Sequence, residues 1–205
     1  AGNTDMVTGT VQVDTDAPDA PVIASYEREG EGYRAISIET TDDAFTAARV
    51  EHDGTVTEIS ASTFENPING ETYFNFDPIV PDGSHLVVSA TDDAGNRAGT
   101  YLVLDETTTS DVSLSAPGLR PYQIENVDLQ FAEESHLTVN AADLKALSEH
   151  SDTLTVHGGS DDSVTVEGSA TKVSQKTIEG ESYDVYDLGN GATLVLDDDI
   201  DLPMT

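Results

Sequence analysis

The sequence predicts a mainly β protein, in which a β-sandwich is followed by a second β-rich domain with one short helix. Three observations support this class. Short runs of alternating apolar and polar residues are separated by Gly, Asp and Asn turn signals. No stretch of the first 106 residues has a helical apolar period. The tripeptide AGN at 1–3 returns at 94–96, and each copy leads into an alternating strand that ends at an aspartate, Asp14 or Asp105.

The two AGN copies lie 93 residues apart, close to the length of one small β-sandwich domain. We therefore expect residues 1–14 to be the last strand and linker of a preceding module, and residues 15–106 to be one complete module. Such an echo is typical of a tandem array, and it indicates a role in extension and linkage.

Seven short strands are expected in the first module. Seven strands in about 90 residues are typical of an immunoglobulin-like (Ig-like) sandwich, and Asp53-Gly54 is a strong hairpin signal. The Cys-Trp-Cys core of antibody domains is absent, because the chain contains neither Cys nor Trp. The expected strands are 21–26, 33–40, 47–53, 56–60, 72–77, 85–92 and 100–105.

A polar stretch rich in Thr and Ser, residues 107–123, is expected to link the sandwich to a second domain at 124–205. Residues 140–150 carry the one good helical pattern. Asn140 suits the N-cap, Asp143 meets the positive end of the helix dipole, and Leu144 and Leu147 share a face. The other segments read as strands, at 127–131, 136–139, 153–158, 163–168, 176–180, 182–188 and 192–199.

The charge of the chain is strongly one-sided. Eight Lys and Arg against 40 Asp and Glu give a net charge of −32 and a pI near 4.1. Such a surface repels nucleic acid and anionic membranes and strains the compact state, so we expect neither partner and a monomeric chain. Divalent cations would relieve the strain, and a salt-rich habitat is a compatible explanation. Without cysteine, disulfides and thiolate metal sites are excluded.

Strand topology predicts where calcium would bind. When consecutive strands run antiparallel, the start of the first strand, the loop after the second and the last hairpin lie at one end of a sandwich. Several oxygen ligands of the kind that calcium prefers would then meet. The alternative is that these residues are solvated loop acids and turn formers. The candidate ligands are Asp14, Asp16, Asp42, Asp43, Asp92, Asp93 and Asn96.

The same reasoning gives weaker candidates further along the chain. Asp105 and Glu106 correspond to the entry into the second domain, where Asp152, Asp161 and Asp162 lie in turns. The GGSDD stretch at 158–162 resembles half of a glycine-rich calcium repeat, but such repeats work by stacking, so a single copy is expected to be a hairpin turn. The three aspartates at 197–199 would open a further calcium joint or form a solvated linker.

Two stretches resemble modules of large bacterial adhesins of the RTX type, which are exported by type I secretion. DTDAPDAPVI (14–23) with SATDDAGN (89–96) is similar to the repeated Ig-like extender domain. Residues 127–168 resemble a β-rich module of the same adhesins. The resemblance implies a stalk or support element at the bacterial cell surface, with calcium at the joints and a role in adhesion and biofilm formation. The acidic loop 27–34 departs from the regular repeats, so a specialised distal module is the other interpretation.

No pattern of catalytic residues is present, and we expect no enzyme. The chain lacks a GxSxG elbow, a P-loop and a dinucleotide fingerprint, and its five histidines have no metal-ligand spacing and are expected to be mostly exposed. The alternative to a structural segment is a module that binds a peptide or glycan on a host or neighbouring cell. Aromatic residues would serve that role or fill the core, at Tyr26, Tyr33, Tyr73, Phe74 and Phe76.

Overall fold

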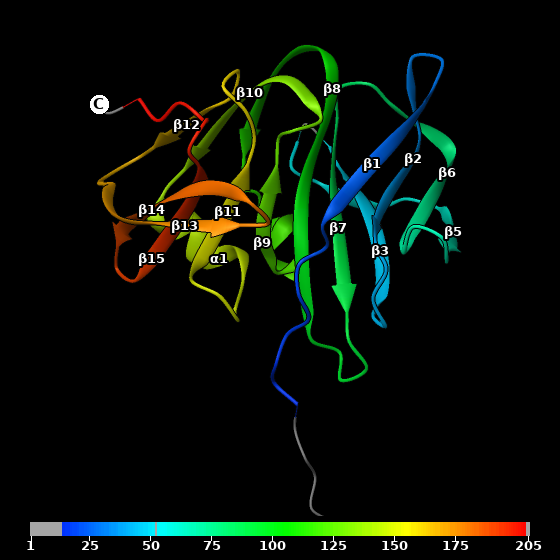
Figure 1. The fold of residues 1–205 in the computed structure, drawn as a ribbon, viewed down its shortest axis with the longest axis horizontal. Coiled ribbons are helices and arrows are strands. Elements are labelled where there is room, and N and C mark those ends of the chain that lie inside the picture. The colour runs from blue at the N-terminus through cyan, green and yellow to red at the C-terminus, as the bar shows by residue number, and fades with distance from the viewer. Residues whose placement is uncertain (1–13, 52, 204–205) are drawn as a thin grey trace, which may run out of the picture.

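The computed structural model describes residues 14–51 and 53–203, and within them the protein is mainly β, as predicted. The described residues form fifteen strands, one α-helix and one 3-10 helix (Figure 1). The expected strand of a preceding module at 1–13 and the predicted exposure of His52 lie outside the described residues. No helix in the described part of the chain is long and apolar enough to cross a membrane.

The first half is a sandwich of two antiparallel sheets. One sheet has the order β1-β2-β6-β5, and the other contains β8-β7-β3-β4. This is the strand order of an Ig-like sandwich with one added edge strand. The strands are β1 (Ile23–Glu29), β2 (Gly32–Glu39), β3 (Ala44–Val50), β4 (Val56–Glu58), β5 (Ala61–Asn66), β6 (Glu71–Pro81), β7 (Ser84–Thr91) and β8 (Arg97–Ser113).

The sandwich core follows the alternation of the sequence. Ile36 and Ile38 of β2 pack with Leu86 of β7 and Leu102 of β8, and all four are fully buried. The aromatic residues Tyr33, Phe74 and Phe76 are also buried, as the core alternative predicted.

The sequence pattern missed strand β5. The expected strand 56–60 is shorter in the structure, where β4 pairs with β3, and β5 follows it and pairs with β6 in the opposite sheet. Most of the β5 side chains are exposed, and the Phe64 side chain is 61% exposed. With neither face buried, the segment has no apolar alternation by which to recognise it.

Strand β8 corrects the expected linker. Residues 107–113 are not a connection but the second half of this 17-residue strand, and residues 117–122 form the 3-10 helix η1 (Pro117–Tyr122). The polar stretch does alternate: Ser110, Val112 and Leu114 are buried, while Thr109 and Asp111 are exposed. Because its inward positions include Ser, the alternation was hidden in a segment rich in hydroxyl residues.

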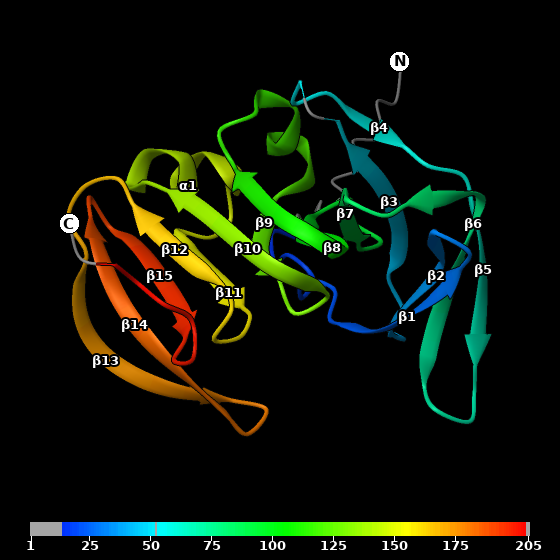
Figure 2. The ribbon, with the colours of Figure 1, turned by 90° about the horizontal axis from the view of Figure 1, so that it is seen from above.

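The second half continues the sheet through β8. Parallel strands β9, β11 and β15 extend it, and the antiparallel β14 and β13 complete its edge. A second layer pairs the end of β8 with β10 and β10 with β12, all parallel. Figure 2 shows β8 at the centre, with the curved β13–β14 hairpin at one side. The strands are β9 (Ile124–Asp128), β10 (Ala132–Val139), β11 (Thr153–His157), β12 (Ser163–Val166), β13 (Thr171–Ile178), β14 (Glu181–Gly189) and β15 (Ala192–Asp197).

The predicted helix is present as α1 (Ala141–Leu147), three residues shorter at its end than expected. The Asn140 side chain accepts hydrogen bonds from the backbone N–H groups of Ala142 (3.0 Å) and Asp143 (2.9 Å), so it caps the helix as predicted. Leu144 and Leu147 are buried against the second core. This short helix packs against β15, β11 and η1, on the side of the sheet that the second core occupies.

Candidate functional site

The entry end of the sandwich brings together two of the segments predicted to bind calcium. The Asn96 side-chain Nδ2 donates to the backbone carbonyls of Asp16 (3.1 Å) and Asp14 (3.4 Å) and to Asp92 Oδ2 (2.8 Å). Three oxygens from the entering chain and from the β7–β8 hairpin therefore surround one amide group.

The third segment, the loop before β3, lies at the same end, because Ala44 pairs with Thr91 at the end of β7. Its acids are occupied locally or exposed: Asp43 Oδ2 accepts from Thr41 Oγ1 at 2.9 Å, and Asp42 and Asp93 face solvent. Among the described residues, these carboxylates form no group of three with ligand atoms within 4.8 Å. The predicted segments meet, but their carboxylates do not.

Asp92 also serves as a turn residue. Its Oδ1 accepts hydrogen bonds from the backbone N–H groups of Ala94 (2.9 Å) and Asn96 (2.8 Å). The hydrogen bond from the Asn96 side chain, followed by the backbone N–H groups, lowers the pKa of Asp92 because these donors stabilise the charged form. The turn-former alternative therefore applies to Asp92 in this structure, and it leaves Oδ2 directed at Asn96.

Asp105 is a structural corner of β8. Its carboxylate is 3% exposed and accepts hydrogen bonds from the backbone N–H groups of Thr107 and Thr108 and from the hydroxyls of Thr108 (2.6 Å) and Ser110 (3.0 Å). Burial opposes ionisation, but these hydrogen bonds outweigh it and hold the pKa of Asp105 below its ordinary value. Both oxygens of Asp105 are used in fixing the bend.

Glu106 belongs to a polar network, so its carboxylate is not free to bind calcium. Arg28 Nη1 lies 2.6 Å from Glu106 Oε2, and the Tyr26 hydroxyl donates to Glu106 Oε1. Asp82 joins them by accepting from Tyr33 OH (2.9 Å) and from the Glu106 backbone N–H (3.2 Å). We call these five residues the Arg28 network. Arg28, one of the eight basic residues of the chain, therefore neutralises Glu106, which was predicted as a calcium ligand.

Asp161 and Asp162 do not meet the Asp105 corner. Asp162 is 3% exposed, and its two oxygens accept from the backbone N–H groups of Ser135 (2.8 Å) and Gly159 (2.9 Å). The described residues contain no hydrogen bond or ion pair between either aspartate and Asp105 or Glu106. The GGSDD stretch is a turn, but it joins two layers instead of closing a hairpin, because β12 pairs with β10.

The three aspartates after β15 lie close together. One ligand oxygen from each of Asp197, Asp198 and Asp199 lies within 4.8 Å of the others, the one group of this kind among the described residues. Asp197 is buried, and burial raises its pKa. Asp198 and Asp199 are exposed, so solvated acids remain the simpler description of this turn.

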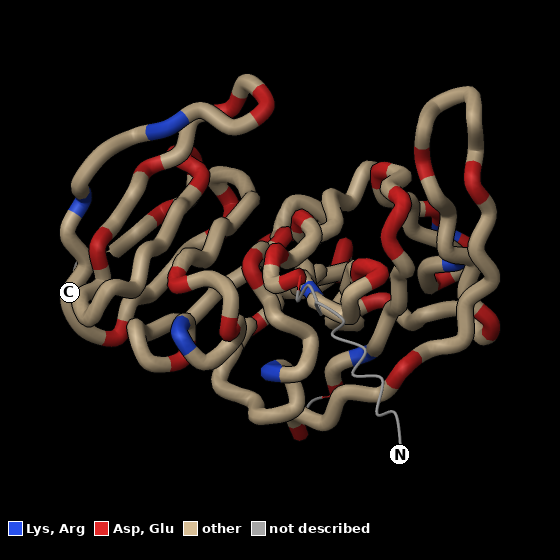
Figure 3. The backbone as a smooth tube through the Cα atoms, turned by 90° about the horizontal axis from the view of Figure 1, so that it is seen from below, with Lys and Arg blue, Asp and Glu red and all other residues tan. Residues whose placement is uncertain are grey.

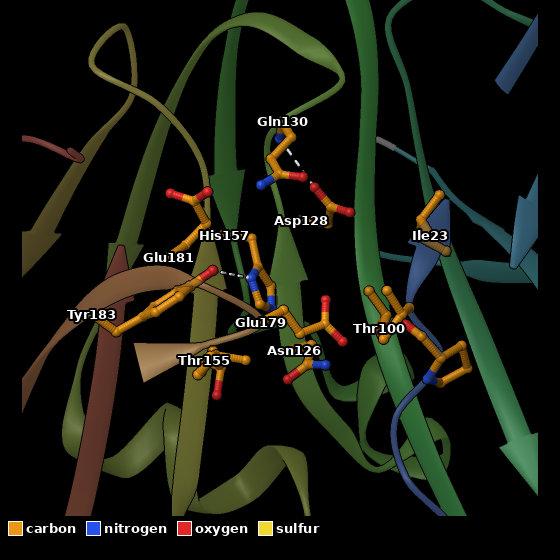
Figure 4. A pocket seen from close by; sticks show the side chains of 13 residues that line it. Ile23, Thr100, Asn126, Asp128, Gln130, Thr155, His157, Glu179, Glu181 and Tyr183 are labelled. Atoms are coloured by element: carbon orange, nitrogen blue, oxygen red, sulfur yellow. Dashed lines mark hydrogen bonds between the residues drawn. The ribbon is translucent and has the colours of Figure 1, made fainter. Parts of the chain in front are cut away.

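A cleft of about 200 Å³ was not predicted from the sequence (Figure 4). Its floor is the outer face of β9 and β11, where Asn126 lies in register with Thr155 and Asp128 with His157. One wall contains residues 21–23 and Thr100, and the other contains residues 178–181 at the β13–β14 turn, together with Tyr183. The cleft therefore lies between the sandwich and the second half.

Asp128 is the buried carboxylate of this cleft and accepts a single hydrogen bond. The residue is 5% exposed, and its Oδ1 accepts from the Gln130 backbone N–H at 3.0 Å. Its Oδ2 has no hydrogen-bond or ion-pair partner among the described residues. Burial raises the pKa of Asp128 to about 7, and the charge of Asp162 adds to the effect. The Asp128 carboxyl therefore has one oxygen without a protein partner, in a cleft that is poorly accessible to solvent.

His157 and Tyr183 form the second polar contact of the floor, with 2.7 Å between Nδ1 and the hydroxyl. Burial lowers the pKa of His157, which favours the neutral ring at neutral pH. The histidine is half-buried on the cleft floor and not an exposed strand residue as expected. The signal was present: Asp128 and His157 are single polar residues next to inward-facing Val127 and Val156.

The charge distribution around these sites is uneven. Figure 3 shows Asp and Glu along both halves of the chain, whereas Lys and Arg are few and scattered. A comparison with protein-family models, with curated protein sequences and with solved structures finds no match to this chain.

Proposed function

We propose that this chain is a non-catalytic structural segment of a secreted, calcium-dependent adhesin of the bacterial cell surface, with a role in cell adhesion and biofilm formation. Strand β8 carries the proposal, because it runs from the sandwich into the second half without a break. Its backbone pairs with β7, β9 and β10 along this length. A continuous strand of this kind suits a segment that holds neighbouring parts of one chain in a fixed arrangement.

Calcium is proposed at the entry end of the sandwich. Three oxygens there lie within 3.4 Å of Asn96 Nδ2. The two ends of an asparagine amide are distinguished only by their hydrogen bonds. Rotating this amide would direct Asn96 Oδ1 towards the same point, so that four oxygens would face a cation. Water would supply the rest of the six to eight ligands that calcium takes, together with Asp43 and Asp93 only if their loops move towards the ion.

A thermal melt with and without calcium tests this proposal. Extracellular calcium modules bind at roughly 10⁻⁴ to 10⁻³ M, so about 10 mM calcium should stabilise the fold by about 1 to 3 kcal/mol per site. The chelator sample is matched in ionic strength with sodium chloride, which separates a calcium site from general screening of the −32 charge. Superimposable melts would contradict calcium binding.

A second candidate function is recognition of a peptide or glycan on a host or neighbouring cell. One observation favours it: the cleft on β9 and β11 has a buried carboxylate with an oxygen that no described group uses. A pure spacer has no need of such a cleft. Glycan and peptide arrays probed with the whole chain separate this candidate from a spacer, which should bind nothing.

A further inference from the structure

The charged side chains that line the cleft on β9 and β11 are all acidic, and the basic charge that acts on its floor residue His157 is that of Lys176 on β13. Its lining contains three carboxylates, from Asp128, Glu179 and Glu181, and neither Lys nor Arg. The remaining polar groups are amides, hydroxyls and His157, whose lowered pKa favours its uncharged form. A ligand that enters this space therefore meets carboxylates at the rim and, on the floor, Asp128, which a cationic ligand would hold in its charged form.

Asp128 differs from Asp105 and Asp162, two other buried carboxylates, and resembles Asp197, which also accepts a single hydrogen bond. Asp105 accepts four hydrogen bonds, and Asp162 uses both of its oxygens. Asp128 accepts one hydrogen bond in the described structure, although its side chain is equally buried. Asp128 Oδ2 has no described partner and is not one of the side-chain atoms sealed from solvent without one, so a donor that enters the cleft can hydrogen-bond to it.

The β13–β14 turn brings a second carboxylate to the cleft. Glu179 and Gly180 are the two central residues of a tight turn, since Ile178 pairs with Glu181, and both have positive φ (52° and 103°). The charge of Glu179 acts on His157, which places it near the floor. Figure 4 shows Glu179 beside Asn126 and Thr155, across the cleft floor from Asp128.

We propose that this cleft binds the ammonium or guanidinium group of a lysine or arginine side chain that a partner protein presents. Asp128 Oδ2 and the Glu179 carboxylate accept its N–H donors, and a charge-assisted hydrogen bond is strongest where water is excluded. The methylene stem lies against the apolar wall of Pro21, Ile23 and Ile178. The inference rests on the second candidate function and gives the chemistry of its ligand.

Size and ring exposure favour a basic side chain over a sugar. A volume of about 200 Å³ accommodates one side chain and not a branched glycan. The ring of Tyr183 is 2% exposed, so it offers no face on which a sugar could stack. The chain has 40 acidic and 8 basic residues, and its net charge of −32 also attracts a cationic partner from a distance.

Isothermal titration of the whole chain with short capped peptides tests the inference. The peptides contain a single lysine, arginine, citrulline or norleucine between glycine and serine residues, and the buffer contains chelator and 0.15 M salt. We expect the lysine or arginine peptide to bind and the two uncharged analogues to bind at least tenfold more weakly. Equal binding of the norleucine peptide, or no binding by any basic peptide, would overturn the inference while leaving the calcium proposal untouched.

Three variants locate the binding. Asp128→Asn keeps the side-chain shape and should reduce affinity at least tenfold, and Glu179→Gln at the exposed turn should reduce it severalfold without affecting folding. Glu65→Gln on β5 is the matched control, because it removes one exposed charge from the far sheet of the sandwich. Equal losses in all three would mean diffuse attraction and would refute the site. A free diamine such as putrescine that binds as tightly as the peptides would refute a protein partner.

Discussion

Arg28 on β1 forms an ion pair with Glu106 on β8, with 2.6 Å between Nη1 and Oε2. Glu106 follows the Asp105 corner, so the pair joins the first sheet of the sandwich to the point at which β8 enters the second half. Asp82 lies 3.4 Å from the same Nη1 and accepts the Glu106 backbone N–H. Together with Tyr33 of β2, which donates to Asp82, the Arg28 network therefore connects four segments at the junction of the two halves.

Removing the cation of this network should destabilise the protein. Arg28→Gln leaves Asp82 and Glu106 close together without a positive charge, so we expect a lower melting temperature, by a few degrees. Arg34→Gln is the matched control, since Arg34 pairs with Glu29 at 3.7 Å with both side chains more than half exposed. Differential scanning calorimetry measures both, and equal shifts would show that the Arg28 network has no special role.

Asp128 should make stability depend on pH. Its pKa is about 7 in the folded protein and near 3.9 when unfolded, so the folded state binds more protons between these values. The free energy of unfolding therefore falls as pH rises from about 4 to about 7, by on the order of 2 to 4 kcal/mol. Asp128→Asn should lack this component and be more stable than the parent at pH 8. Urea denaturation between pH 5 and pH 8 measures it, and parallel curves for the two proteins would contradict the assignment.

Calcium-dependent stabilisation should depend on the entry end of the sandwich. Asp92→Asn keeps the turn acceptor but removes one charge, and Asn96→Ala removes the amide at the centre of the three oxygens. Each should reduce the calcium-induced shift in melting temperature by at least half. Asp53→Asn is the control, because Asp53 likewise accepts a backbone N–H two residues on, from Thr55 at 2.9 Å, and lies in the β3–β4 turn at the other end. Equal effects of all three would indicate diffuse counterion binding.

The second half of β8 should be protected from hydrogen exchange with or without calcium. The backbone of residues 109–113 pairs with β10, and Val112 is buried. We expect slow exchange there in chelator, and small-angle scattering profiles of the whole chain that superimpose in both conditions. Rapid exchange of these amides, together with a wider distance distribution in chelator, would support the flexible linker that the polar composition predicted.

Several features followed from the sequence because their causes are local. Alternation gave most strands of the sandwich, and Asn140 with the Leu144 and Leu147 spacing gave helix α1. Strand β5 and the end of β8 were missed for an equally local reason. One has exposed side chains on both faces, and the other has serine at a buried position, so neither shows an apolar pattern.

By itself, the sequence determined the β class, the helix cap and the excess negative charge, since each depends on neighbouring residues or on composition. Only the tertiary structure decided which acids are free. Asp105 and Asp162 are satisfied by hydrogen bonds, Glu106 is paired with an arginine 78 residues away, and Asp128 retains an unused oxygen. With 40 acids in the chain, spacing could not distinguish them, because the partner of each is set by parallel and antiparallel pairing between distant strands.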